Sequence, residues 1–152
     1  MEIVYIETSV VSMLVAKPSR DLVTAGHQQA TRDWWQSRGP GFHCVTSDET
    51  LVESARGDQE QARLRLEALA ALPALTITNE VEILAAELLS TASLPATARA
   101  DYLLTWNCRH LANAQILRRL EREAVRCGWY LPTVCTPLEL MGDSNYENEP
   151  DP

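Results

Sequence analysis

Residues 1–12 read MEIVYIETSVVS, and this stretch decides the fold. The run Ile3–Ile6 is β-branched and aromatic without polar alternation, a pattern typical of a strand that is buried on both faces in a parallel sheet. Glu7 follows it directly, and a carboxylate at the C-terminal end of such a strand faces the crevice in which open α/β sheets bind ligands. Thr8 and Ser9 can cap a helix whose free N–H groups point the same way. The stretch therefore predicts a functional edge of a parallel sheet.

Beyond this stretch, apolar β-rich runs alternate with segments of helical period, which predicts an α/β fold with a mainly parallel central sheet. The later strands are expected at 42–46, 74–78, 102–105 and 131–135. Helices are expected at 10–16, 19–38, 48–56, 59–72, 80–90 and 111–126, with a final turn at 137–141.

The chain has 152 residues and a net charge of −8. Its length predicts one domain over 1–142, followed by an acidic tail at 143–152 that is expected to be disordered. The tail carries four acids and no base, so the remaining residues still stand at −4. A nucleic-acid site would therefore need a local basic patch or bridging metal ions. One such patch is offered by arginines of the last long helix, where a solvated polar face is the simpler interpretation: Arg109, Arg118, Arg119, Arg122 and Arg126.

No apolar run reaches the length of a membrane span, and the N-terminus lacks the basic and apolar regions of a signal peptide. We therefore expect a soluble, cytoplasmic protein with no membrane partner. The four cysteines are scattered without a CxxC pair, which favours reduced thiols over a disulfide framework. A zinc site built from His43, Cys44, Cys108 and His110 is disfavoured, because no zinc-ligand spacing is present.

Polar oxygen-bearing residues stand at the ends of several expected elements. Glu7 follows the first strand, Glu53 lies on the helix after the second, and Asn107 follows the fourth. Asp101 comes just before that fourth strand. Carboxylate and amide oxygens suit hard cations such as Mg²⁺ or Mn²⁺. Taken singly, each acid is as well explained as a surface residue that caps a helix.

The order of these motifs resembles that of PIN-domain proteins, including the VapC-type toxin ribonucleases. The string VYIETSV at 4–10 is similar to the family's opening, where a strand ends in an acid followed by Thr-Ser. Residues 47–58 are similar to the second acidic motif, and LLTWNC at 103–108 to the last one, with RHLAN at 109–113 typical of one branch. The resemblance covers nearly all of residues 1–141.

The resemblance implies a three-layer α/β/α sandwich and a Mg²⁺- or Mn²⁺-dependent endoribonuclease, in which metal-activated water hydrolyses RNA. It also implies control by a protein antitoxin and a homodimer. Glu7 and Glu53 would be metal ligands, and Asn107 would be the last ligand or would orient a metal-bound water.

The sequence departs from the family at two places. Glu7 stands where Asp is commoner, and its extra methylene moves the carboxylate outward by about 1.5 Å. In the family a third acid, an Asp, begins a long helix before the last strand, whereas here Asp101 touches that strand directly. Asp101 is then either the third metal ligand or an ordinary residue after loss of the helix. Such a loss predicts weaker metal binding and an exposed apolar face near Leu103 that needs a partner. It also motivates an alternative, a degenerate PIN module that binds RNA or a protein without cleavage.

Overall fold

The computed structural model describes residues 1–75, 100–109, 114–127 and 131–142. Several predictions lie outside these residues: the helix at 80–90, the end of the strand at 74–78, the start of the helix at 111–126, the side chain of His110 and the tail at 143–152.

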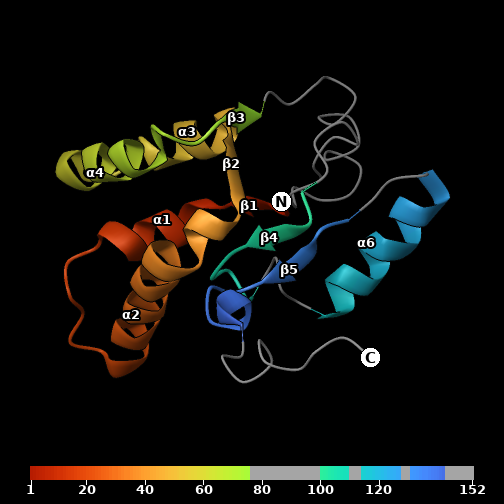
Figure 1. The fold of residues 1–152 in the computed structure, drawn as a ribbon, viewed down its shortest axis with the longest axis horizontal. Helices are drawn as coiled ribbons and strands as arrows, with labels where there is room; N and C mark the ends of the chain where they lie inside the picture. The colour runs from red at the N-terminus through yellow and green to blue at the C-terminus, as the bar shows by residue number, and fades with distance from the viewer. Residues whose placement is uncertain (76–99, 110–113, 128–130, 143–152) are drawn as a thin grey trace.

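In the described part of the chain, five parallel strands form one sheet in the order β3-β2-β1-β4-β5 (Figure 1). The strands are β1 (Ile3–Ile6), β2 (His43–Ser47), β3 (Ala74–Leu75), β4 (Tyr102–Leu104) and β5 (Thr133–Cys135). The predicted α/β fold with a parallel sheet is confirmed. From the central β1 the chain first adds strands on one side and then on the other, so the strand order reverses between β1 and β4. Open α/β sheets bind ligands at such a switch point, outside the carboxyl ends of the strands.

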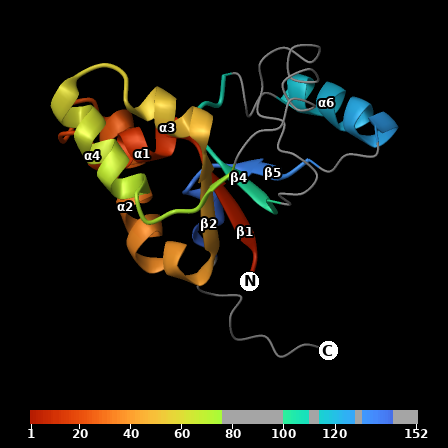
Figure 2. The same cartoon turned by 90° about the horizontal axis from the view of Figure 1, so that it is seen from above.

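Helices flank the sheet on both faces (Figure 2). The helices α1, α2 and α4 lie against one face, and α6 lies on the other side of the sheet. The bounds are α1 (Thr8–Val15), α2 (Leu22–Ser37), α3 (Asp48–Ser54), α4 (Gln59–Leu69) and α6 (Ala114–Cys127), with the short 3₁₀ turns η1 (Gly39–Gly41) and η2 (Glu139–Met141).

The starts of the helices follow from their caps. Ser47 caps α3, because its hydroxyl accepts a hydrogen bond from the Thr50 N–H. The first helix begins at Thr8 and not at residue 10, because Glu7 itself is the cap. The second begins at Leu22 because Asp21 caps it, three residues later than the sequence suggested.

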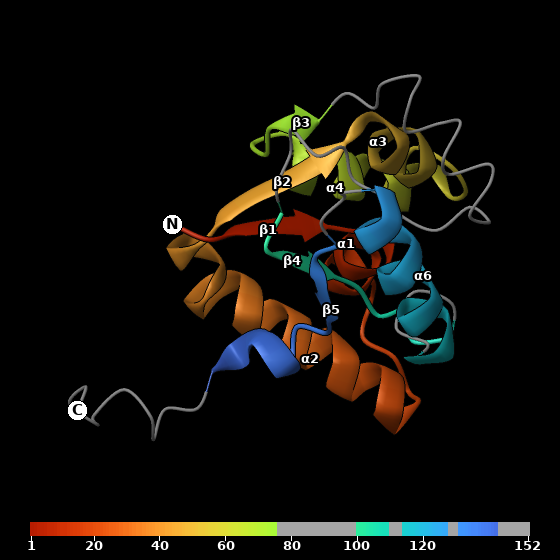
Figure 3. The ribbon, with the colours of Figure 1, turned by 90° about the vertical axis from the view of Figure 1, so that its right-hand side faces the viewer.

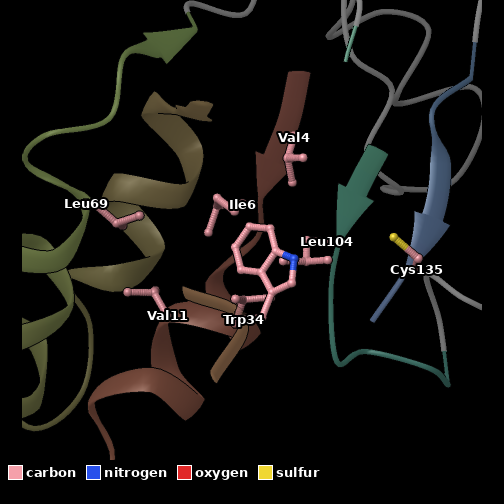
Figure 4. Close-up of a cluster of buried hydrophobic side chains, with 8 residues drawn as sticks. Val4, Ile6, Val11, Trp34, Leu69, Leu104 and Cys135 are labelled. Carbon is pink, nitrogen blue, oxygen red and sulfur yellow. The ribbon is translucent and has the colours of Figure 1, made fainter. Parts of the chain in front are cut away.

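The main core lies between β1, β4 and the helices α1, α2 and α4 (Figure 4). The Trp34 indole lies at its centre, among Ile6, Val11 and Leu104. Trp34 is fully buried and Trp35 packs against the same core, so both tryptophans of α2 serve core packing. The even-numbered residues of β1 face this core.

The opposite face of the sheet is also buried. It contains Tyr5, Val45, Ala100 and Leu103, and Leu103 is only 1% exposed. The prediction of an uncovered apolar face near Leu103 is therefore wrong. Exposed apolar surface at this place no longer argues for a protein partner. Since both faces of β1 are covered, its unbroken apolar sequence has a direct explanation.

Among the described residues, no helix is both long and apolar enough to cross a lipid bilayer. The described cysteine side chains, Cys44, Cys108 and Cys135, are free thiols. Burial raises the pKa of the Cys135 thiol to about 11, so this residue stays protonated at neutral pH.

Candidate functional site

The candidate site lies where β1, β2 and β4 end. Figure 3 shows the arrowheads of β1 and β2 pointing to the side of the molecule on which α1 and α3 begin. Because neighbouring parallel strands run in the same direction, the residues that follow each strand meet at one edge. We call this the carboxyl edge of the sheet, and the opposite end of the strands the amino edge.

Glu7 is held at the carboxyl edge through one of its two carboxylate oxygens. Oε2 accepts hydrogen bonds from the Ser9 N–H at 3.0 Å, from the Thr105 hydroxyl at 2.8 Å and from the Ser9 hydroxyl. The Glu7 N–H donates to the Leu104 carbonyl at 3.2 Å, which continues the pairing of β1 with β4. In the described part of the chain Oε1 has no protein partner. The carboxylate is therefore fixed in direction and retains one oxygen for a ligand.

Two hydroxyls join the loop after β4 to the start of α1. The Thr105 hydroxyl, which is fully buried, accepts from the Asn107 N–H at 2.9 Å, and the Ser9 hydroxyl accepts from the Trp106 N–H at 2.8 Å. The same two hydroxyls donate to Glu7. The Thr105 hydroxyl therefore links the backbone N–H of Asn107 to the carboxylate of Glu7. The sequence had assigned Ser9 to helix capping alone and had given Thr105 no separate role.

Glu53 reaches the carboxyl edge from α3. Its Oε2 accepts a hydrogen bond from the Thr8 hydroxyl at 2.7 Å, and Thr8 is the neighbour of Glu7 in the chain. The bond is open to solvent, since Glu53 is exposed and Thr8 is half-buried. The structure therefore brings Glu7 and Glu53, which are far apart in sequence, to the same edge.

Asp101 lies at the amino edge. Its Oδ2 accepts from the Ile3 N–H at 2.7 Å, and its own N–H donates to the Ile3 carbonyl at 2.8 Å. Ile3 is at the start of β1, four residues and about 13 Å of strand from Glu7. Oxygens that share one Mg²⁺ lie about 3 Å apart, because each is about 2.1 Å from the ion. The structure therefore does not bring Asp101 together with Glu7 and Glu53.

Under the carboxyl edge lies a buried group of hydroxyls that the sequence analysis missed. The Tyr5 hydroxyl contacts the Ser47 hydroxyl at 2.8 Å and the Thr50 hydroxyl at 2.7 Å. Burial raises the pKa of Tyr5 above its usual 10, the two hydrogen bonds lower it in part, and the charges of Glu7 and Glu49 raise it further.

Glu49 lies in the first turn of α3, which directly follows β2, and its charge is the smallest of the causes that raise the pKa of Tyr5. Glu49 is four residues before Glu53, so the two share one side of α3. Its spacing of four residues from Glu53 is the sequence signal that puts a further acid on this side of α3.

Next to the site, Trp106 is fixed against α2. Its ring stacks on His27 with the centroids 4.0 Å apart and the planes at 16°, and its indole N–H donates to the Thr31 hydroxyl at 2.8 Å. These contacts hold the loop that carries Asn107. A one-dimensional pattern could not pair Trp106 with a histidine so far away in the sequence.

The donor set determines which metal fits. Among the described residues, no group of three or more His, Cys, Asp or Glu side chains lies close enough to enclose an ion. Two carboxylates at an open edge suit Mg²⁺ or Mn²⁺, which keep several waters and take further ligands from substrate phosphates. They do not suit a structural zinc ion, which needs a closed set of four ligands.

Comparisons with known proteins give no further guide to identity. No protein-family model matches the chain, and no curated protein or solved structure matches it either. The fold class and the arrangement of the carboxyl edge are therefore established from the structure of this chain alone.

Proposed function

We propose that the carboxyl edge is the active centre of a PIN-domain, VapC-like endoribonuclease that hydrolyses RNA phosphodiester bonds with Mg²⁺ or Mn²⁺. The observation that carries the proposal is the hydrogen bond between Thr8 and Glu53, since it brings the acid of the second motif to the residue beside Glu7. The position of both acids at the switch point of a parallel sheet also supports it.

In this proposal Glu7 and Glu53 hold the metal ion. A bound ion would lower the pKa of a coordinated water and offset the negative charge that develops on the phosphate. The chain's own residues do the positioning: Ser9 and Thr105 fix Oε2 of Glu7 and leave Oε1 to the ligand, and Thr8 does the same for Glu53. Asn107, carried on the loop that Thr105 anchors, contacts a water or the substrate.

The RNA must approach a chain with a net charge of −8. Exposed arginines of α6 supply a basic surface for its phosphates, and arginine suits bidentate contacts to phosphate oxygens. The exposed arginines are Arg109 before the helix and Arg118, Arg119, Arg122 and Arg126 on it. Reversing the charge of Arg118 and Arg119 should lower the affinity for RNA and reduce its salt dependence. Unchanged affinity and unchanged salt dependence would exclude this surface.

Control by a protein antitoxin, assembly as a homodimer and a place in the cytoplasm belong to the same proposal and rest on the resemblance of the motifs. Sedimentation of the purified chain tests the dimer directly, and a monomer at micromolar concentration would remove it.

A second candidate function is a PIN module that binds RNA or a protein without cutting. The location of Asp101 favours it, because only Glu7 and Glu53 of the three predicted metal ligands meet at the carboxyl edge. Fewer carboxylates mean weaker metal binding, and with it slower chemistry.

One assay separates the two functions. Labelled RNA is incubated with Mn²⁺ and either wild type, Glu7→Gln, Glu53→Gln or Asp101→Asn. Asp101→Asn is the matched control, because it removes an acid at the amino edge and keeps an oxygen to accept from Ile3. The nuclease proposal predicts cleavage by wild type and Asp101→Asn and its loss in both Glu variants. RNA binding without cleavage by all four proteins would establish the second function.

A further inference from the structure

A two-acid site on two separate elements needs a device that fixes one element against the other. Glu7 caps α1, whereas Glu53 lies on α3, a helix of only seven residues. Such a short helix is not stable alone and depends on its anchors. Contacts with the rest of the molecule must therefore fix the position of α3 beside β1.

Among the described residues, the buried hydrogen bonds between β1 and the start of α3 converge on one hydroxyl group. Tyr5 lies on β1, two residues before Glu7, and is only 7% exposed. Its hydroxyl reaches the two residues that build the start of α3: Ser47, which is the cap, and Thr50, whose N–H donates to the Ser47 hydroxyl at 3.3 Å. Ser47 and Thr50 are themselves buried.

From this geometry we propose that the Tyr5 hydroxyl is the positioning group that fixes α3, and with it Glu53, against Glu7. Its consequence for metal binding rests on the function proposed above. Thr50 and Glu53 lie three residues apart on α3, so the anchored residue and the acid are on adjacent turns of one side. A shift of α3 at Thr50 therefore moves the Glu53 carboxylate.

Other contacts also hold α3: the solvent-exposed bond from Thr8 to Glu53, the packing of Leu51 against the main core, and the bond from the Arg65 guanidinium to the Ser54 carbonyl at 3.0 Å. Water competes for an exposed hydrogen bond, whereas a buried and fully paired network is stronger and more rigid. The Tyr5 hydroxyl can donate one hydrogen bond while it accepts another, so it can pair with the Ser47 and Thr50 hydroxyls at the same time.

The test uses Tyr5→Phe, which keeps the ring and removes only the hydroxyl. The variant is expected to fold, because the Ser47 and Thr50 hydroxyls lie 3.5 Å apart and can pair with each other. Tyr102→Phe is the matched control: it also removes one tyrosine hydroxyl, but from the amino edge, where that hydroxyl donates to Glu2 at 3.0 Å.

The first measurement needs no metal. Amide hydrogen exchange is followed for residues of α3 and for the strands β1 and β4. We expect Tyr5→Phe to accelerate exchange in α3 about 5-fold while the strands keep their wild-type rates, since loss of one buried hydrogen bond is worth about 1 kcal/mol. Wild-type rates in α3, or an equal acceleration throughout the chain, would overturn the proposal.

The second measurement is the Kd for Mn²⁺, at a temperature where every variant is folded. Supporting residues of metal sites commonly change metal affinity by about 10-fold or more, so Tyr5→Phe should weaken binding by about 10-fold and Tyr102→Phe should not. Thr50→Val should reproduce the loss, Thr50→Ser should not, and the effects of Tyr5→Phe and Thr50→Val should be strongly non-additive.

The two proposals fail in different ways. If Glu7→Gln and Glu53→Gln leave Mn²⁺ binding unchanged, the proposed metal site is wrong, and hydrogen exchange alone decides the role of Tyr5. If those two variants lose binding and Tyr5→Phe does not, the metal site stands and the positioning role of Tyr5 is refuted.

Discussion

The carboxyl edge and the amino edge of the sheet contain similar groups and use them differently. Each edge has one acid and one tyrosine hydroxyl. Asp101 bonds to the first residue of β1, and Glu7 directly follows the last one. At the carboxyl edge Glu7 accepts from two side-chain hydroxyls and one backbone N–H, all through one oxygen. At the amino edge Asp101 accepts from the backbone N–H of Ile3 and closes the sheet there. In this molecule the acid before β4 stabilises the sheet, whereas the acid after β1 keeps one carboxylate oxygen without a partner among the described residues.

The tyrosines make the same contrast. The Tyr5 hydroxyl is buried between two hydroxyls that belong to the start of α3. The Tyr102 hydroxyl donates to Glu2 in solvent. We therefore expect changes at the carboxyl edge to affect both stability and metal binding, and changes at the amino edge to affect stability alone.

The largest effect on stability is expected at Thr105. Thr105→Val removes a fully buried hydroxyl that bonds to Glu7 and to the Asn107 N–H, and it leaves that N–H without its partner. We expect a loss of about 2–3 kcal/mol in the free energy of unfolding, measured by urea denaturation. Thr133→Val, at an exposed position on β5, is the control and should change it by less than about 0.5 kcal/mol. Equal small losses would mean that the carboxyl edge is not held as described.

Asp101→Ala should have the next largest effect. It leaves the Ile3 N–H without its acceptor, and we expect a loss of about 1–2 kcal/mol by the same measurement. The Kd for Mn²⁺ should not change. A weaker affinity for Mn²⁺ would show that Asp101 contributes to metal binding, and the proposed difference between the two edges would then be wrong.

A smaller loss is expected at Trp106. Trp106→Phe removes the indole N–H that donates to Thr31 and keeps an aromatic ring to stack on His27. We expect a loss of about 1 kcal/mol in the free energy of unfolding. If the loop carries Asn107 as proposed, cleavage of RNA should fall as well. Full activity with reduced stability would separate this contact from the site.

The smallest effect is a difference in alkaline stability. Burial raises the pKa of Tyr5, so the folded chain keeps this proton to higher pH than the unfolded chain does. Its contribution to stability is therefore complete below about pH 10 and is lost as the pH rises through the folded pKa. Tyr5→Phe should flatten the decline of the urea midpoint above pH 10 more than Tyr102→Phe does, because the Tyr102 hydroxyl is exposed and screened. A wild-type decline in Tyr5→Phe would exclude this assignment.

Much of the fold could be predicted from local pattern. The apolar run at Ile3–Ile6 indicates a strand buried on both faces, and its neighbours confirm this. The placement of Glu7 follows from strand polarity alone. The same rule, applied to Asp101, would have placed it at the amino edge, because it precedes β4. The resemblance of the motifs to a known family kept it among the candidate ligands.

The features that could not be predicted from the sequence depend on contacts between residues far apart in the chain. The approach of Tyr5 to Ser47 and Thr50 requires the pairing and register of β1 with β2. The stacking of Trp106 on His27 requires α2 to lie over the end of β4. The burial of Leu103 likewise reflects packing that no short motif encodes.

The most direct test of the account is a titration with Mn²⁺ in which free Mn²⁺ is followed by electron paramagnetic resonance. Wild type, Glu7→Gln, Glu53→Gln and Asp101→Asn are compared at neutral pH. The account predicts that both Glu variants raise the Kd by about 10-fold or more and that Asp101→Asn leaves it unchanged. Equal binding by all four proteins, or a loss in Asp101→Asn as large as in Glu7→Gln, would contradict it.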